Sequence, residues 1–148
     1  MRGKVLLFWG GILLAMFCAA CALADSETAE NSYQLYFREE DLSASSGGDV
    51  FRTETVELAE GLDTQASVEA LVEGLLDGPQ SELLRGTLPA STTLLSAKVE
   101  GSRAVVDFSA AYSTLSGVRL TMADYAVTLT LTQLPEITSV KITVQGQE

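Results

Sequence analysis

The chain contains no histidine, and its two cysteines, Cys18 and Cys21, both lie near its start. The missing imidazole excludes the usual Ser-His-Asp and Cys-His catalytic arrangements, and it excludes zinc sites built on histidine. The position of the cysteines leaves the rest of the chain without a disulfide or a thiolate metal site. Gly47-Gly48 is followed by no Gly-Lys-Ser/Thr motif and no predicted helix, so a phosphate-binding loop is excluded as well.

Positive charge is also scarce, because nine Lys and Arg stand against 20 Asp and Glu, for a net charge of −11. Such a balance disfavours nucleic acid and bare anionic membrane as partners. The acids are scattered along the chain, which is typical of a solvated surface. Two carboxylates can hydrolyse glycosides, but among so many acids no spacing distinguishes one pair. We therefore predict no catalytic residue, no cofactor and no metal.

The first 24 residues are typical of an export signal. Arg2 and Lys4 precede an apolar run from Val5 to Cys21, which is the charged-then-apolar order of such a signal. A retained membrane anchor is the alternative, although the run is short for a spanning helix. Removal of the leader would take away its two cations and lower the net charge from −11 to about −13.

Two cleavage sites compete within this leader. Ala22-Leu23-Ala24 fits the small-x-small site of ordinary signal peptidase, which would release a soluble protein. Alternatively, Ala19-Ala20-Cys21 resembles a bacterial lipobox, in which Cys21 becomes the lipidated N-terminus, although Cys18 stands where that pattern favours leucine. Both options place the protein outside the cytoplasm. We expect lipidation at Cys21, the one residue to which a specific chemical role is assigned.

The part of the chain after the leader divides into a tether and a domain. Residues 22–31 are small, polar and acidic, as in a flexible tether, and residues 32–148 are predicted to form the folded domain. Apolar residues that alternate from Tyr33 to Phe37 predict a first strand. A second strand is expected from about Val50 to Leu58.

A helix follows the first two strands. Five apolar residues recur at the spacing of one helical face: Val68, Leu71, Val72, Leu75 and Leu76. Asp63, Thr64 or Ser67 can cap its start, and Gly78-Pro79 predicts its end.

Residues 94–109 predict a β-hairpin around Gly101-Ser102, with glycine first, as a type II′ turn requires. The apolar pairs share one face, so a slip by one residue would expose them all. The predicted pairs are Glu100 with Arg103, Val99 with Ala104, Ala97 with Val106 and Leu95 with Phe108.

The stretch from Thr121 to Leu134 combines two signals. The alternation of Val127, Leu129 and Leu131, together with several β-branched residues, favours a strand. Thr121 and Asp124 look like a capping box that precedes apolar residues at helical spacing. We predict a helix here.

Alternating apolar residues from Val140 to Val144 predict a last strand, which ends at Gly146. The predicted order is therefore strand, strand, helix, hairpin, helix, strand (β-β-α-β-β-α-β). The economical way to bury these apolar stripes is an α+β fold with one mixed sheet of about five strands and both helices packed on one face.

Two further features are candidates for function. Asp107 lies between apolar residues of the hairpin, but the alternation turns it outward beside Ser96, so we predict a solvated side chain rather than a buried functional acid. Tyr112 and the loop Ala110–Arg119, with Gly117, form either a contact surface or a mere connection.

A series of short segments, taken in order, resembles one known family, the GerMN domain family of sporulation and germination lipoproteins. The segments are Glu69–Pro79, Leu88-Pro89, Thr93-Leu94, Val99, Gly101, Ala104–Ser109, Leu129–Leu131, Leu134-Pro135 and Val140. The resemblance covers about residues 33–146, and it implies a small α+β domain similar to the ring-building modules of secretion and sporulation channels. It brings no catalytic residues to carry over.

The resemblance implies a non-enzymatic module outside the membrane that assembles with envelope or sporulation proteins, with self-association also open. We expect it to be a lipoprotein on the outer face of the cell membrane, linked to sporulation or spore germination. The alternative is an accessory module that binds peptidoglycan and serves a hydrolase. A carboxylate-based hydrolase is the third option.

Overall fold

The computed structural model describes residues 31–39 and 50–148, in which two helices and six strands form. The elements are β1 (Ser32–Glu39), β2 (Phe51–Glu57), α1 (Thr64–Asp77), β3 (Leu84–Arg85), β4 (Leu94–Glu100), β5 (Arg103–Phe108), the 3₁₀ helix η1 (Ala110–Thr114), α2 (Val118–Leu131) and β6 (Ser139–Val144). The predicted order is confirmed, with the short strand β3 and η1 added. The predicted leader, Cys21 and residues 22–30 of the tether lie outside the described residues.

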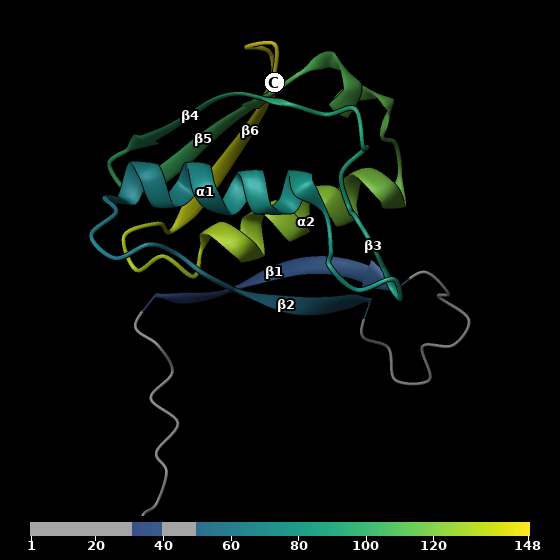
Figure 1. The fold of residues 1–148 in the computed structure, drawn as a ribbon. Helices are drawn as coiled ribbons and strands as arrows, with labels where there is room; N and C mark the ends of the chain where they lie inside the picture. The colour runs from purple at the N-terminus through teal and green to yellow at the C-terminus, as the bar shows by residue number, and fades with distance from the viewer. Residues whose placement is uncertain (1–30, 40–49) are drawn as a thin grey trace, which may run out of the picture.

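The strands form two sheets. One has the antiparallel order β2-β1-β3, and the other has the order β4-β5-β6, in which β4 and β5 are antiparallel and β5 and β6 parallel. Figure 1 shows both helices between these sheets, where α1 contacts β4 and β1, and α2 contacts β1 and β6. The α+β class is confirmed, but the expectation of a single mixed sheet with both helices on one face is wrong.

Two glutamine side chains join the helix layer to the backbones of the sheets. Gln133 lies just after α2. Its side-chain oxygen accepts a hydrogen bond from the backbone N–H of Gln34 in β1 at 2.8 Å, and its side-chain nitrogen donates to the Gln34 carbonyl at 2.7 Å. Gln65 of α1 accepts the N–H of Val99 in β4 at 3.0 Å and donates to the carbonyl of Ala97. Each amide satisfies a strand edge as a neighbouring strand would. Gln133 therefore links the end of α2 to β1, and Gln65 links α1 to β4.

We expect Gln133→Ala to lower the free energy of unfolding by about 2 kcal/mol, because the part-buried N–H and carbonyl of Gln34 lose their partners. Urea unfolding of residues 31–148, followed by circular dichroism, measures this change. Gln80→Ala, at an exposed site, is the matched control and should change the free energy by less than about 0.5 kcal/mol. Equal effects of the two substitutions would show that the hydrogen bonds from Gln133 to Gln34 do not stabilise the fold.

The start of α1 is fixed by Asp63, one of the three predicted caps. Its carboxylate accepts the N–H of Ala66 at 2.8 Å. Gly78 follows the last helical residue with a φ of +83°, a conformation that favours glycine and ends the helix.

The second predicted helix is confirmed as α2, but its ends differ from the prediction. The helix begins after its N-cap residue, Gly117, which has a φ of +56°. It ends at Leu131. Thr121 therefore lies inside the first turns, where its hydroxyl donates to the Gly117 carbonyl at 3.3 Å. The predicted capping box of Thr121 and Asp124 is wrong, because the left-handed glycine starts the helix earlier.

The predicted hairpin register is confirmed near the turn and wrong at its far end. Glu100 faces Arg103 as a cross-strand pair, and Gly101 takes a φ of +65°. A bulge between Leu94 and Ser96 then shifts the pairing, so that Leu94 and not Leu95 faces Phe108. Leu95 is consequently 52% exposed.

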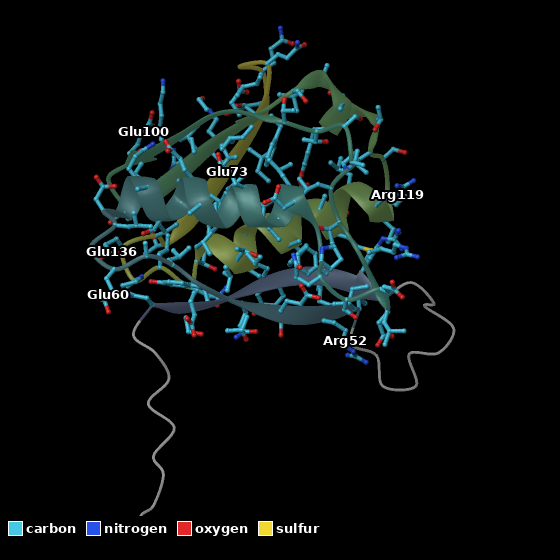
Figure 2. The ribbon with its side chains drawn as sticks, viewed as in Figure 1. Arg52, Glu60, Glu73, Glu100, Arg119 and Glu136 are labelled. Carbon is cyan, nitrogen blue, oxygen red and sulfur yellow. The ribbon has the colours of Figure 1, made fainter. Side chains whose placement is uncertain are left out.

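The core fills both sides of the helix layer. Its largest fully buried side chains come from all three layers: Phe37, Phe108, Leu71, Leu75 and Leu131. The charged side chains labelled in Figure 2 lie at separate places on the outside, on different elements and loops. This distribution agrees with a solvated acidic surface.

Candidate functional site

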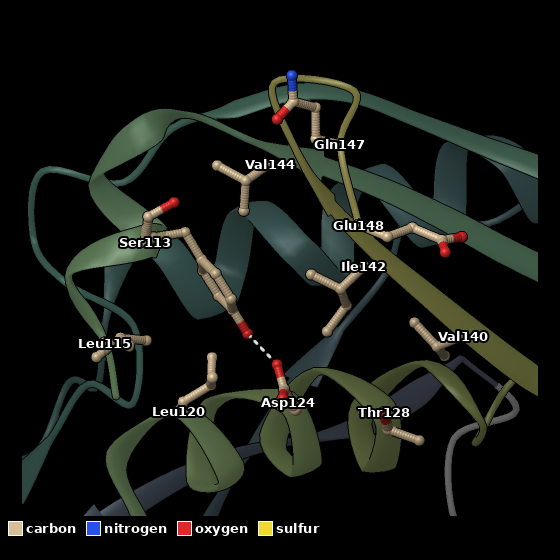
Figure 3. Close-up of a pocket in the computed structure, with 11 residues that line it drawn as sticks. Ser113, Leu115, Leu120, Asp124, Thr128, Val140, Ile142, Val144, Gln147 and Glu148 are labelled. Atoms are coloured by element: carbon tan, nitrogen blue, oxygen red, sulfur yellow. Dashed lines mark hydrogen bonds between the residues drawn. The ribbon is translucent and has the colours of Figure 1, made fainter. Parts of the chain in front are cut away.

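An open groove of 640 Å³ lies between β6, η1 and α2 (Figure 3). Its lining is mixed, with polar and apolar surface in similar amounts, and β6 contributes the apolar residues Val140, Ile142 and Val144, which are only half-buried. Leu115 and Leu120 form the opposite side, after η1 and at the start of α2. The alternation of β6 is therefore as predicted, but its apolar stripe is left partly open to solvent.

The outer edge of β6 borders this groove. Gln145 donates its N–H to the Phe108 carbonyl of β5 at 3.0 Å, whereas Val144 donates to the Gln147 carbonyl at 2.8 Å. Successive backbone groups of a strand point to opposite sides. The N–H and carbonyl groups of Val140 and Ile142 therefore point away from β5, as those of Val144 do.

A hydrogen-bonded pair lies in the groove wall. The Tyr112 hydroxyl donates to Oδ1 of Asp124 at 2.6 Å, drawn as the dashed line in Figure 3. The Tyr112 ring stacks on Phe108 with centroids 4.9 Å apart and planes 7° from parallel. Tyr112 is 3% exposed, so within Ala110–Arg119 it is a core residue rather than a contact surface. Its neighbours Ser113 and Leu115 line the groove.

Burial and the adjacent carboxylate of Asp124 raise the pKa of Tyr112 far above its usual value near 10. The hydroxyl therefore remains a hydrogen-bond donor at every ordinary pH. Asp124 is half-buried on α2 and lines the groove, and its Oδ1 is the oxygen that accepts the Tyr112 hydroxyl.

This raised pKa predicts a loss of stability in alkali. Above pH 10 the unfolded chain releases the Tyr112 proton that the folded chain keeps, so unfolding becomes more favourable by up to about 1.4 kcal/mol per pH unit. Below the unfolded pKa this stability is fully present. Urea unfolding between about pH 9 and 11 should show the slope, and Tyr112→Phe should remove it. Tyr125→Phe, at a 57% exposed site, should retain it.

Asp107 lies beside Ser96 as predicted, but it is not the solvated acid that the alternation suggests. It is half-buried, and its Oδ1 accepts the Thr143 hydroxyl at 2.7 Å and the Gly146 N–H at 2.8 Å. The carboxylate thus holds the turn that follows β6. Sequence alone could not indicate this, because it does not show that β6 lies beside β5.

A second apolar surface lies where the start of β2 meets the first turns of α2. It lines a hollow of 370 Å³ that includes Val50, Phe51 and Met122. Val118 is 76% exposed and Tyr125 57% exposed on the same surface. The sequence analysis did not identify it, because Val118 lies in the predicted loop and Tyr125 in the predicted helix, and neither pattern indicates that the start of β2 lies beside them.

Neither surface has the arrangement of a metal centre. Within residues 31–39 and 50–148, no group of three or more Asp, Glu, Cys or His could hold a metal ion. Among the same residues, no helix has the length and apolarity needed to cross a membrane.

The layers and the element order define a small α+β domain. The family described as "Germane: Sporulation and spore germination" matches residues 34–148. The chain belongs to this family, which confirms the resemblance found in its sequence.

Solved structures with this fold include proteins from two bacteria. The first GerMN domain of the sporulation protein GerM from Bacillus subtilis is 24% identical, with a TM-score of 0.62 over 79% of this chain and 84% of that one. A candidate lipoprotein from Clostridium perfringens is 22% identical, with a TM-score of 0.53. The match covers 78% of this chain and 75% of that one. The tandem GerMN domains of GerM are 24% identical, with a TM-score of 0.55. This match covers 79% of this chain and 40% of that longer one. No curated protein sequence matches significantly.

Proposed function

We propose that this protein is a non-enzymatic lipoprotein module, exported and attached to the membrane through Cys21, which binds another envelope protein during sporulation or spore germination. Membership of a family linked to sporulation and spore germination supports the proposed role in one of these processes. The likeness to a candidate lipoprotein of the same fold, together with the lipobox-like residues before Cys21, supports the attachment.

The groove beside β6 is the observation that carries the binding role. It combines half-buried apolar side chains, a carboxylate and a strand edge in one concave surface. Sites that bind proteins or peptides commonly combine apolar contacts with a few oriented polar groups. Asp124 is held in place by Tyr112, so this polar group has a fixed position in the wall.

The test is purification of the tagged full-length protein after cross-linking in its host, in growing and in sporulating cells. We expect envelope proteins of the sporulation or germination apparatus to be recovered with the unchanged protein. Leu120→Arg and Thr128→Arg, which each place a cation in the groove wall, should reduce that recovery. Leu83→Arg, at a 78% exposed site outside the groove, is the matched control.

Two outcomes would contradict the proposal. One is recovery of a free monomer in both growth phases. The other is sedimentation of the protein with isolated peptidoglycan without any envelope protein, which would favour the accessory wall-binding role instead.

A further inference from the structure

The free edges of the sheets are protected in different ways. The edge of β4 is closed by the Gln65 amide, and that of β1 by the Gln133 amide. The edge strand β2 carries Arg52, Glu54 and Glu57, and charges on an edge discourage pairing with another strand.

The edge of β6 lacks such protection over most of its length. Its sequence from Ser139 to Val144 includes a single charged residue, Lys141. Apolar side chains line the groove on one side of the strand, and the backbone groups of Val140 and Ile142 point outward at its edge. An edge of this kind is a template for another strand.

The chain itself begins such a strand. Gln145 and Gly146 have φ values of +50° and +76°, as in a type I′ hairpin turn. The turn brings Gln147 back against β6, where Val144 and Gln147 exchange N–H to carbonyl hydrogen bonds of 2.8 and 3.0 Å. This reciprocal exchange is the pattern of an antiparallel pair. The outer edge of β6 therefore already accepts antiparallel pairing at one end.

The charge of the groove restricts what can pair there. Its charged lining residues are Asp124 and Glu148, and Glu148 forms an ion pair with Lys141 of β6, so a cation of the partner is assigned to Asp124. A strand added beside β6 would direct every second side chain toward α2, where Leu120, Asp124 and Thr128 lie. Apolar side chains fit beside Leu120, and a lysine or arginine fits beside the Asp124 carboxylate. A second copy of this chain fits poorly, because two chains of net charge −11 repel one another.

We infer that β6 is a strand-addition site, which takes an extended, apolar and basic segment of a partner protein antiparallel to β6, with a cation beside Asp124. This inference rests on the proposed function and names the partner segment for the same groove. Main-chain hydrogen bonds to Val140 and Ile142 would supply affinity, and the groove would select the side chains.

The experiment is photo-cross-linking of the full-length protein in its sporulating host, with benzoylphenylalanine in place of Val140. The matched positions are Glu73, on the exposed side of α1, and Tyr125, on the second apolar surface. We expect Val140 to capture a segment of an envelope protein that contains Lys or Arg, at least about tenfold more often than Glu73 does. Mass spectrometry of the linked peptide identifies the segment.

Asp124→Asn removes the negative charge of this side chain but keeps an oxygen that can accept the Tyr112 hydroxyl. It should lower the capture at Val140 about tenfold, whereas Asp77→Asn, at an exposed site on α1, should leave it unchanged. With the captured segment added as a synthetic peptide, the amides of Val140 and Ile142 should exchange hydrogen about tenfold more slowly. A segment without a basic residue, equal effects of the two substitutions, or unchanged exchange at both amides would overturn the inference.

The outcomes separate the inference from the function on which it rests. Capture of an envelope protein from Tyr125 but not from Val140 would overturn strand addition at β6 and leave the proposed function standing. Absence of capture at every position, with only free monomer recovered, would overturn both.

Discussion

Phe108→Ala will lower the free energy of unfolding by about 3–5 kcal/mol, which is a large share of the stability of a domain of this size. Phe108 is fully buried at the end of β5, and its ring stacks on Tyr112. The substitution leaves a cavity between the second sheet and the helices and removes the ring that positions Tyr112. Urea unfolding of residues 31–148, with the slope compared as well as the midpoint, measures the loss.

Phe51→Ala provides the matched control for this prediction. Phe51 is half-buried and meets Tyr36 edge to face, with ring centroids 6.1 Å apart. We expect a smaller loss, of about 1–2 kcal/mol, because part of the Phe51 side chain already faces water. If the two alanine variants unfold at the same urea concentration, Phe108 does not anchor the core as described.

Local patterns in the sequence predicted most elements of this fold because each element obeys a short-range rule. Asp63 caps α1, Gly78 ends it, and Gly101 fixes the hairpin turn through its positive φ. These signals depend only on neighbours in the chain, so they can be interpreted without the tertiary structure.

The number of sheets could not be predicted in the same way. Sheet membership depends on pairings between strands far apart in the sequence, such as the parallel pairing of Arg103 in β5 with Ser139 in β6. A glutamine within a loop or helix gives no local indication that its amide will close a strand edge. The bulge near Leu95 escaped the prediction for a related reason, since a regular alternation contains no signal for one extra residue.

The groove was missed because its parts come from three separate elements. Asp124 was interpreted as a helix cap, and Tyr112 as part of a loop, whereas the structure joins them by a hydrogen bond. Val140 and Ile142 are also partly exposed, whereas an apolar stripe usually indicates residues that are fully buried. A stripe shows which residues share one side of a strand, but not whether another element covers that side.

Cys21→Ala will move the full-length protein from the membrane fraction to the soluble exported fraction. A diacylated cysteine gives firm anchoring, whereas one lipid chain binds a bilayer only marginally, and loss of the thiol removes the attachment point altogether. Fractionation of host cells and medium, combined with metabolic labelling by an alkyne fatty acid, measures both location and lipid. The unchanged protein should carry the label and remain with the membrane.

Cys18→Ala makes the same chemical change three residues earlier and should alter neither location nor label. This pair of variants distinguishes the three fates open to the leader. Cleavage after Ala24 would release an unlabelled protein in all three forms, because Cys21 would leave with the leader. An uncleaved anchor would keep all three in the membrane without label. Only lipidation at Cys21 makes membrane location depend on one cysteine and not on the other.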